Sequence, residues 1–402
     1  MVGLDVAPNP GVAATKPKVL EVLRAGLDAW LATHQPTPEQ ARLVRDLRRC
    51  RTAALGGHLY VCPACTYELP VYNPCGNRHC PNCQALHQER WIAARAAVLL
   101  PVGHHHVVFT LPSQLRPLVR SAPREMYQLL FEASAETLAT LATDTLEATL
   151  GVTAVLHTWR RDLGFHPHLH CIVSGGGLRT DDTQWVARQQ FLFPVRRMKA
   201  RFRSKVLARL HQLRQRGAWS MLLDAEWRRV LRSLPSQRKW VVYLDAPFGR
   251  STHVLEYLGR YTHRVAISDA RLIAAEAQSV SFSTRQGQVA QLPLAQFVDR
   301  FFQHVLPSAF HKIRHFGLYA PGHTRRRLDV ARALLGQGDQ AAREAPSPEA
   351  APSPLAPPGD PEPRSEPRSP GDALSCPLCG HQGLLYYILP PVNPPRRLWR
   401  PP

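Results

Sequence analysis

The stretch FHPHLH (residues 165–170) alternates apolar and imidazole side chains, which is the pattern of a half-buried β-strand. Residues two apart in a strand project to the same side, so His168 and His170 share one face. Leu169 and Cys171 lie on the other face, where they would meet a core. Two imidazoles on one face predict a metal-binding site. The alternative interpretation is a pair of half-buried structural histidines.

The residues before this strand predict a hairpin. GVTAVLHTW (151–159) is apolar and rich in β-branched residues, and RDLG (161–164) supplies turn residues. Closing a four-residue loop at this turn places His157 opposite His168, and directly opposed residues share a face. His157 is therefore the expected third ligand, with His166 on the same face as its rival. A shift of the register by one residue would move His157 to the other face.

A second pattern lies further along the chain, in YLGRY (257–261). Tyr257 and Tyr261 are four residues apart in what reads as a helix, so both phenols lie on one face. Phenols can act as nucleophiles that form covalent intermediates. Two packing aromatic side chains are the alternative interpretation. Arg260 and Arg264 lie nearby and would attract phosphate.

The N-terminal region carries two CxxC pairs, which account for four of the nine cysteines. Fourteen residues separate the pairs, a spacing typical of a tetrahedral structural zinc site with its thiolates on tight turns. The sequence therefore predicts one Zn²⁺ held by Cys62, Cys65, Cys80 and Cys83. Three neighbouring side chains are alternative ligands or would complete a second site: His58, Cys75 and His79.

A third CxxC pair lies near the C-terminus. Cys376 and Cys379, followed by His381, form half of a zinc ribbon. Two thiolates cannot fill a tetrahedral site, so this pair needs His381 and a further ligand, or a partner. The alternative is an unstructured tail whose cysteines bind no metal.

The charge of the chain indicates a polyanionic partner. Fifty Lys and Arg residues against thirty Asp and Glu give a formal net charge of +20, and the pI is about 10.2. Apolar residues at helical spacing predict a helix over about 195–216. Its other face carries a basic row that we expect to follow a phosphate backbone: Arg197, Arg201, Lys205 and Arg209. A solvated basic face is the alternative.

The chain has no run of eighteen apolar residues and no basic, apolar N-terminal signal. We expect a cytoplasmic, nucleoid-associated protein without a membrane partner. A reducing cytosol also suits cysteines that bind metal rather than form disulfides. The sequence does not determine the oligomeric state.

Five motifs occur in one order and carry a family resemblance: CGNRHCPNCQ (75–84), HVVFTLP (106–112), FHPHLH (165–170), YLGRYTHRVAIS (257–268) and FHKIRHFG (310–317). With these motifs the chain resembles the transposases of the insertion sequence 91 family, which are HUH enzymes of the two-tyrosine class. The likeness extends from about residue 40 to about residue 335.

The resemblance implies a function and a mechanism. The enzyme would nick and rejoin single-stranded DNA at the ends of an insertion sequence by a rolling-circle-like route. Mg²⁺ or Mn²⁺, bound by His168, His170 and a third ligand, would polarise the scissile phosphate. Tyr257 and Tyr261 would then form 5′-phosphotyrosine links, and no nucleotide cofactor is needed. For the fold, the resemblance implies an antiparallel sheet with the HxH strand at its centre.

Strands alternating with helices around one sheet predict an α+β fold. The stretch from 336 to 372 is rich in Pro, Ala, Ser and Glu, which predicts an extended, disordered linker. The expected domains are an N-terminal helical segment (1–50), a zinc-binding DNA-contact module (51–100), a catalytic domain (101–335), the linker (336–372) and a CxxC tail (373–402).

Other functional classes remain open at this point. A relaxase or a replication initiator of the HUH type would use the same chemistry on different DNA ends. A nuclease with an acidic triad would need three converging carboxylates and would form no covalent adduct with DNA. A non-catalytic zinc regulator of DNA would explain the cysteines and the charge but would leave the HxH and tyrosine pairs without a role.

Overall fold

A computed structural model of the chain describes residues 16–188, 192–245, 266–322, 325–342 and 375–392. The chain divides into two compact units. One unit comprises residues 1–83, 267–302 and 357–402, and the other comprises residues 84–266 and 303–356. Each is described by itself.

The second unit is built on a six-stranded sheet. Its strands are β3 (His104–Thr110), β4 (Ala148–Trp159), β5 (Phe165–Arg179), β6 (Trp185–Ala187), β7 (Val241–Leu244) and β11 (Ile313–Gly317). The order is β11-β4-β5-β3-β7, β6 pairs with β5, and every pairing is antiparallel. β5 carries the HxH residues and lies in the middle, so the predicted antiparallel sheet with this strand at its centre is confirmed.

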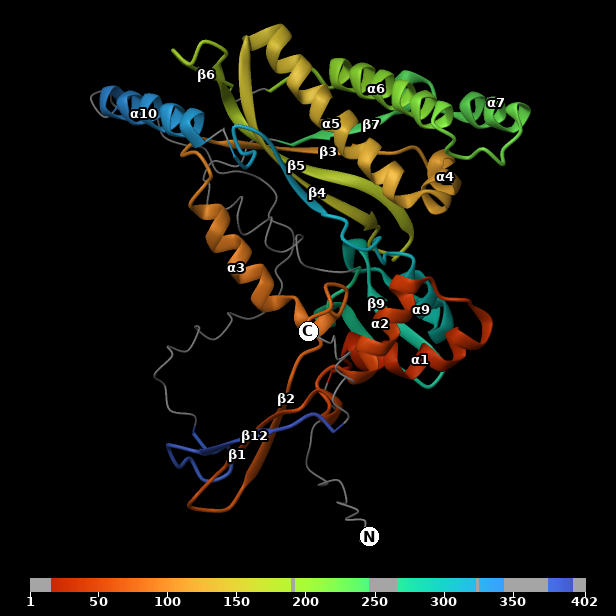
Figure 1. Cartoon of the computed structure of the whole chain (residues 1–402), viewed down its shortest axis with the longest axis vertical. Coiled ribbons are helices and arrows are strands. Elements are labelled where there is room, and N and C mark those ends of the chain that lie inside the picture. Colours follow the sequence, from red (N-terminus) through yellow and green to blue (C-terminus); the bar gives the residue numbers. More distant parts are fainter. Residues whose placement is uncertain (1–15, 189–191, 246–265, 323–324, 343–374, 393–402) are drawn as a thin grey trace, which may run out of the picture. The chain divides into compact units, whose positions relative to one another are not determined.

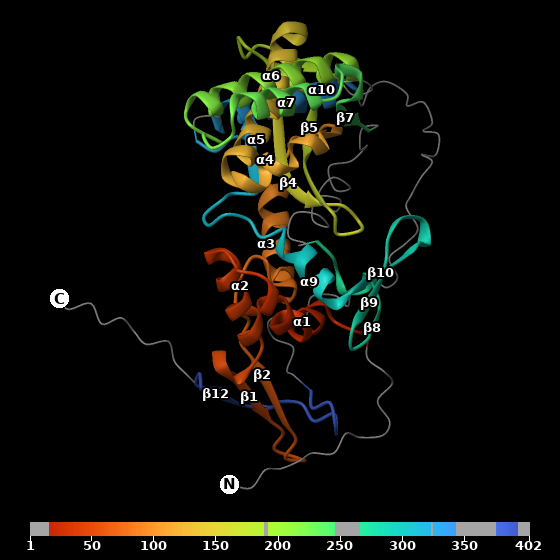
Figure 2. The ribbon, with the colours of Figure 1, turned by 90° about the vertical axis from the view of Figure 1, so that its right-hand side faces the viewer.

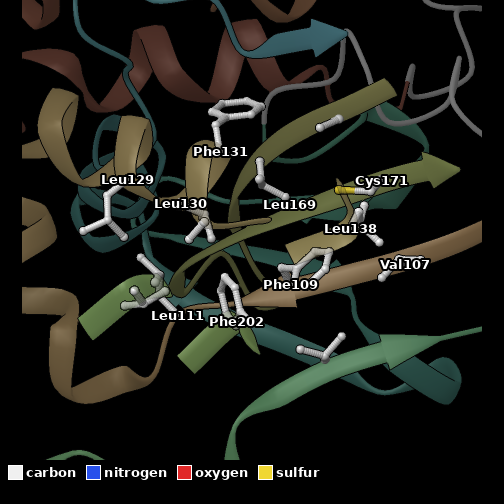
Figure 3. Close-up of a cluster of buried hydrophobic side chains, with 14 of the residues drawn as sticks. Val107, Phe109, Leu111, Leu129, Leu130, Phe131, Leu138, Leu169, Cys171 and Phe202 are labelled. Atoms are coloured by element: carbon white, nitrogen blue, oxygen red, sulfur yellow. The ribbon is translucent and has the colours of Figure 1, made fainter. Parts of the chain in front are cut away.

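Helices cover one face of this sheet (Figure 1). They are α4 (Arg116–Ser121), α5 (Pro123–Leu146), α6 (Val195–Gln215) and α7 (Asp224–Ser233). The predicted apolar stripe of α6 is confirmed: Met198, Phe202, Val206 and Leu210 are all buried. Figure 3 shows Leu169 and Cys171 of β5 in the same cluster as side chains of α5 and α6. The apolar side of the HxH strand therefore faces a hydrophobic core, as its alternation predicts.

A residue in the left-handed conformation determines where the long helix α5 ends. The sequence suggests a helix reaching about Leu150, but Glu147 adopts left-handed backbone angles (φ 50°) and its N–H bonds to the carbonyls of Ala142 and Thr143. This cap ends the helix at Leu146. Residues from Ala148 onward join β4.

The other face of the sheet holds a smaller cluster. Val155 and Ile172 are fully buried there, and Trp91 of α3 (Ala85–Ala96) packs against them. The helix α10 (Arg325–Ala342) belongs to the same unit and continues past residue 336, where the linker is expected to begin. The rest of the expected linker, from residue 343, lies outside the described residues.

The first unit has three α-helices among its described residues: α1 (Val19–Thr33), α2 (Pro38–Arg49) and α9 (Leu294–Phe302). Thr37 and Gln40 form a capping box that begins α2, with Pro38 at the first helical position. Trp30 of α1 stacks on Phe302 of α9, with ring centroids 4.4 Å apart. Gly26 allows the close approach, because a Cβ there would lie 2.6 Å from Val298.

Two small sheets complete this unit. One has the order β10-β9-β8, formed by β8 (Leu272–Ala275), β9 (Ser279–Ser283) and β10 (Val289–Pro293). The other has the order β12-β1-β2, formed by β1 (Gly57–Val61), β2 (Glu68–Tyr72) and β12 (Leu385–Leu389). Figure 2 shows β12, near the C-terminus, beside the N-terminal strands β1 and β2.

This division differs from the domains expected from sequence. Residues 267–302, expected within the catalytic domain, group with the N-terminal helices, and the CxxC tail groups with the cysteine module. Local sequence patterns cannot show such long-range pairings.

Within the described residues, no helix is long and apolar enough to cross a membrane.

Candidate metal centres and their surroundings

Three imidazoles come together on the central hairpin. β4 and β5 pair His157 directly with His168, and His170 lies two residues further on the same face of β5. One ring nitrogen from each of the three lies within 4.8 Å of the others. The structure thus brings together the three side chains predicted as ligands and leaves the rival His166 outside the group.

The turn of this hairpin and the pairing next to it differ from those expected, although the histidines are paired as expected. Trp159, not Arg160, pairs with Phe165. The amide of Arg160 donates to the carbonyl of Gly164 at 2.9 Å, so the turn is reduced to residues 161–163, and Leu163 takes left-handed angles (φ 63°). A β-bulge beyond that pair then shifts the register back. Pro167 lies in the bulged stretch and has no N–H for the ladder. The two departures cancel, so the histidine pairing is as predicted.

A fourth imidazole contacts this group. His106 of β3 places Nε2 2.8 Å from Nδ1 of His170, and the two rings stack almost parallel, with an interplanar angle of 3°. In the sequence, His106 stands out only as part of a family motif, and it was not predicted to belong to the site. The alternation of β3 was the available signal, since its neighbours Val107 and Phe109 belong to the core on the other face.

Hydrogen bonds orient the ring nitrogens. Nδ1 of His168 lies 2.6 Å from the carbonyl oxygen of His166 and donates to it. Nε2 of His168 is therefore free of a proton, and it lies 3.1 Å from Nε2 of His170. Nδ1 of His170 is engaged by His106. The Nε2 atoms of the HxH pair thus converge on one position.

Burial keeps the imidazoles of His106, His168 and His170 neutral. Desolvation lowers the pKa of His168 and of His106 to about 4. Desolvation, followed by the neighbouring His157, His168 and His106, lowers the pKa of His170 well below its ordinary value. Neutral imidazole is the form that binds a metal ion.

Positive charge lies at the same end of the sheet. Burial, followed by the charges of Arg116 and Arg160, lowers the pKa of His166. The pKa of Arg116 is itself lowered by burial and then by Arg160 and Arg120. Nε of Arg116 is buried and has no hydrogen-bond partner among the described residues. The clustering of cations favours an anionic partner here.

The cysteines form two clusters of four, and neither is the predicted set. One cluster comprises Cys50, Cys75, Cys80 and Cys83, and the other comprises Cys62, Cys65, Cys376 and Cys379. The expected grouping of Cys62 and Cys65 with Cys80 and Cys83 is therefore wrong. The β1–β2 hairpin explains the error: one CxxC pair lies at its turn and the other beyond its open end. Five residues of strand separate these ends by about 15 Å.

Sulfur–sulfur distances in the first cluster suit a tetrahedral ion. Sγ of Cys83 lies 3.6 Å from Sγ of Cys50 and 3.7 Å from Sγ of Cys75. Cys80 donates to Cys50 at 3.5 Å. Hydrogen bonds from the other three thiols lower the pKa of Cys50, first among them that from Cys75. Cys50 was not predicted as a ligand, because it belongs to no CxxC pair. His79, a predicted alternative, is buried but lies outside the cluster.

The basic row on α6 is mostly occupied by ion pairs. Arg201 pairs with Asp144 at 3.0 Å and Lys205 with Glu136 at 3.2 Å, both on α5. Arg209 also contacts α5, through Glu132 at 3.1 Å. Three of the four residues in this row thus join two helices of this unit, and Arg197 is exposed.

The predicted nucleophiles cannot be placed. Tyr257, Tyr261, Arg260 and Arg264 all fall within 246–265, outside the described residues.

Comparisons with known proteins identify the family. Residues 151–327 match the family described as "Putative transposase", and residues 22–111 match the "Transposase zinc-binding domain". The chain is 37% identical to "Putative transposase y4qJ" of Sinorhizobium fredii (strain NBRC 101917 / NGR234), over 96% of this chain and 99% of that protein. It is 29% identical to the "Transposase for insertion sequence element IS801" of Pseudomonas savastanoi pv. phaseolicola, over 70% of each.

The chain belongs to the insertion sequence 91 family of transposases and has the zinc-binding domain of that family. A transposase is a DNA-processing enzyme, so the polyanion indicated by the net charge of +20 is DNA. No solved structure matches the chain.

Proposed function

We propose that this transposase nicks and rejoins single-stranded DNA at the ends of its element. A divalent metal at His157, His168 and His170 would activate the phosphate, and Tyr257 and Tyr261 would attack it. The observation that carries the proposal is the convergence of three imidazoles on the central hairpin. A DNA-binding regulator without catalysis would have no use for this arrangement.

The imidazole group fits a metal ion. The two Nε2 atoms of His168 and His170 lie 3.1 Å apart. Adjacent ligands of an octahedral ion at about 2.1 Å lie roughly 3 Å from each other. The outer nitrogen of His168 is held by a carbonyl and that of His170 by His106, as is usual for ligating histidines. Nitrogen donors favour Mn²⁺ over the harder Mg²⁺. When bound, the ion would supply Lewis-acid polarisation of the scissile phosphate.

The tyrosines would carry the covalent step. One phenol oxygen forms a bond to phosphorus as the bond from phosphorus to the 3′ oxygen breaks. The phenol loses its proton, the 3′ oxygen gains one, and the 5′ end stays attached to the protein. A second tyrosine would allow a second cut while the first end is still held, which strand transfer between donor and target requires.

Basic side chains beside the imidazoles would position the DNA backbone. Arg116 and Arg160 lie close enough to His166 to lower its pKa. A phosphate near the metal would satisfy the buried Nε of Arg116. DNA contact by Arg197, Arg260 and Arg264 also remains part of the proposal. The ion pairs of Arg201, Lys205 and Arg209 favour a structural role for those three.

The first cysteine cluster would hold structural zinc. With Zn–S bonds of about 2.3 Å, the sulfurs of a tetrahedral site lie about 3.8 Å apart. The sulfur–sulfur contacts among Cys50, Cys75, Cys80 and Cys83 are 3.5 to 3.7 Å. A closed set of four thiolates leaves no open position for chemistry, so this ion would serve folding.

The test is incubation of the protein with labelled single-stranded DNA from the ends of its element and Mn²⁺. We expect a covalent adduct that survives denaturing electrophoresis and disappears after protease treatment. The variant His105→Gln is the control for changes to the imidazole group and should still form the adduct. His105 is next to His106 in sequence, but its ring bonds to the carbonyl of Arg188 and not to the group. Nicking without any adduct would contradict the tyrosine mechanism, and no nicking at all would favour a non-catalytic regulator.

A further inference from the structure

We propose that the chain binds a second structural zinc ion through Cys62, Cys65, Cys376 and Cys379, and that this ion fastens the C-terminal segment to the N-terminal hairpin. The sulfurs of these four residues lie within 4.8 Å of one another. Sγ of Cys62 lies 3.6 Å from that of Cys379, and Sγ of Cys65 lies 3.6 Å from that of Cys376. These separations approach the edge of about 3.8 Å expected of a zinc tetrahedron.

The N-terminal half of this site is a preformed turn. The amide of Cys62 donates to the carbonyl of Tyr67 at 2.9 Å, and the amide of Thr66 donates back to the carbonyl of Cys62 at 2.9 Å. Thr66 adopts left-handed angles (φ 58°), which a threonine rarely does. The strained turn aims the thiols of Cys62 and Cys65 at one position.

The C-terminal half repeats the same geometry. The amide of Cys376 donates to the carbonyl of His381 at 2.8 Å, and the amide of Gly380 donates to the carbonyl of Cys376 at 2.9 Å. Gly380 has the matching left-handed conformation (φ 74°). Both turns therefore have the same pair of backbone hydrogen bonds at the same spacing. The imidazole of His381 is not needed as a ligand, because the hairpin supplies the two missing thiolates.

Backbone pairing places the two halves together. β12 pairs antiparallel with β1 along its whole length, from Gly57 opposite Leu389 to Val61 opposite Leu385. The amide of Val392 continues the contact by donating to the carbonyl of Ala53 at 3.2 Å. This register brings the two turns to the same end of the ribbon, although Cys65 and Cys376 are 311 residues apart in sequence.

Apolar burial is too small to hold the segment without a metal. Four of the five residues of β12 are about half to three quarters exposed: Leu385 48%, Tyr386 52%, Tyr387 51% and Ile388 73%. An isolated ribbon of this kind is marginally stable at best. Metal binding to a site formed only in the folded state contributes its binding free energy to folding. Disulfides fit less well, because sulfurs at 3.6 Å are far beyond an S–S bond of about 2.05 Å.

Half of this site lies beyond what the family matches cover. The zinc-binding domain match ends at residue 111 and the transposase match ends at residue 327. Cys376 and Cys379 therefore belong to neither. The inference also does not rest on DNA cleavage, so its failure and that of the proposed function can be told apart.

The test is the zinc content of the full-length protein, purified under reducing conditions. All measurements are made in a His168→Ala background, so that the imidazole group does not add zinc. We expect about two zinc ions per chain, one for each cysteine cluster. Replacing both tail cysteines (Cys376→Ser with Cys379→Ser) should remove one ion. The control Cys171→Ala should keep both, since Cys171 is buried in the sheet of the other unit.

Alkylation followed by mass spectrometry shows which ion is lost. In the tail variant, Cys62 and Cys65 should become reactive while Cys50 and the rest of its cluster stay protected. One zinc ion in the parent protein, or two in the tail variant, would overturn the inference. If the variant loses all zinc, a chelator titration of the parent decides. As the chelator removes zinc from the parent protein, the four thiols of the proposed site should become reactive together: Cys62, Cys65, Cys376 and Cys379. If Cys376 and Cys379 reacted before Cys62 and Cys65, the proposed second zinc site would be wrong.

Discussion

The histidine group and the cysteine clusters are supported by different parts of the fold. His157, His168 and His170 stand on two strands in the middle of a six-stranded sheet that has a hydrophobic core behind it. The cysteine clusters lie at the ends of a short ribbon whose residues, apart from Gly57, are exposed or half-buried. The sheet should therefore hold the imidazoles in place without a metal, whereas the ribbon should need its metal to fold. Loss of metal should abolish catalysis at the histidine group without unfolding the sheet, whereas loss of zinc should unfold the ribbon with the cysteine clusters.

The largest effect is expected from Cys80→Ser. Cys80 is fully buried in the first cluster, and a zinc site of this kind contributes about 10–16 kcal/mol to the folding of small modules. Residues 50–83 should lose their protection from hydrogen exchange by orders of magnitude, while the sheet of the other unit keeps its own. Hydrogen exchange with mass spectrometry measures both in one experiment. Full protection of residues 50–83 in zinc-free protein would contradict the claim that this region needs its metal to fold.

The converse is expected from His168→Ala and His170→Ala. Each change removes a proposed ligand rather than core volume, so the melting temperature should stay within a few degrees of the parent. A metal contributes several kcal/mol to phosphate activation, and 1.4 kcal/mol is a factor of ten, so cleavage should fall by about a thousandfold. Cleavage rates at limiting Mn²⁺, with circular dichroism as the folding check, test this. Full nicking by either variant would exclude its histidine as a ligand.

The same contrast explains what the sequence could predict. The histidine pairing depends on one hairpin, in which strand alternation and turn residues determine which side chains are opposed. Even the two local departures, at Leu163 and around Pro167, cancelled within a few residues. His106 was missed because it comes from a separate strand, and no local rule aligns β3 with β5.

The cysteine sets depend on distant parts of the chain. Cys50 precedes the hairpin and Cys376 follows the rest of the molecule, so spacing alone favoured the two nearest CxxC pairs. Residues 267–302 group with the N-terminal helices, which no local pattern indicates, because this grouping depends on the packing of α9 on α1. The ion pairs of α6 illustrate the same limit: charge periodicity shows a basic face, but not the acidic helix beside it.

Substitution of the tyrosines should abolish the covalent step without unfolding the sheet or the cysteine module. Tyr257→Phe and Tyr261→Phe each remove a single hydroxyl, so packing should survive. If both act as nucleophiles, each single variant should lose complete transposition and the double variant should form no covalent DNA adduct. Transposition frequency in cells and adduct formation on labelled strands are the two measurements. Parental transposition frequency in one single variant would show that its tyrosine is dispensable.

A smaller effect is expected from His106, which contacts a proposed ligand rather than the metal. Loss of such a supporting hydrogen bond typically weakens metal affinity by 10–100-fold. In His106→Ala, the Mn²⁺ concentration for half-maximal cleavage should rise by about that factor, while the rate at saturating Mn²⁺ stays within about threefold. His106→Gln should restore part of the affinity, because its amide can still bond to Nδ1 of His170. An unchanged Mn²⁺ requirement in His106→Ala would assign His106 to packing alone.

The smallest effect is expected from a change of pH on the Mn²⁺ affinity of the histidine group, and here too the cysteine clusters should behave differently. Three ordinary imidazoles, with pKa values near 6.5, would lose about a thousandfold in metal affinity at pH 5.5, because each would be mostly protonated. Burial lowers the pKa of His168 to about 4 and that of His170 well below its ordinary value, so both stay neutral there. Between pH 7.5 and 5.5, Mn²⁺ affinity should therefore fall by no more than about tenfold. Zinc at the cysteines should weaken far more, because thiols must lose protons to bind it. Titration with Mn²⁺ by electron paramagnetic resonance, and zinc release to a chelator at the same pH values, measure the two trends. A steep loss of Mn²⁺ affinity would mean that the imidazoles are more hydrated than their burial implies, and that the sheet protects them less than the contrast requires.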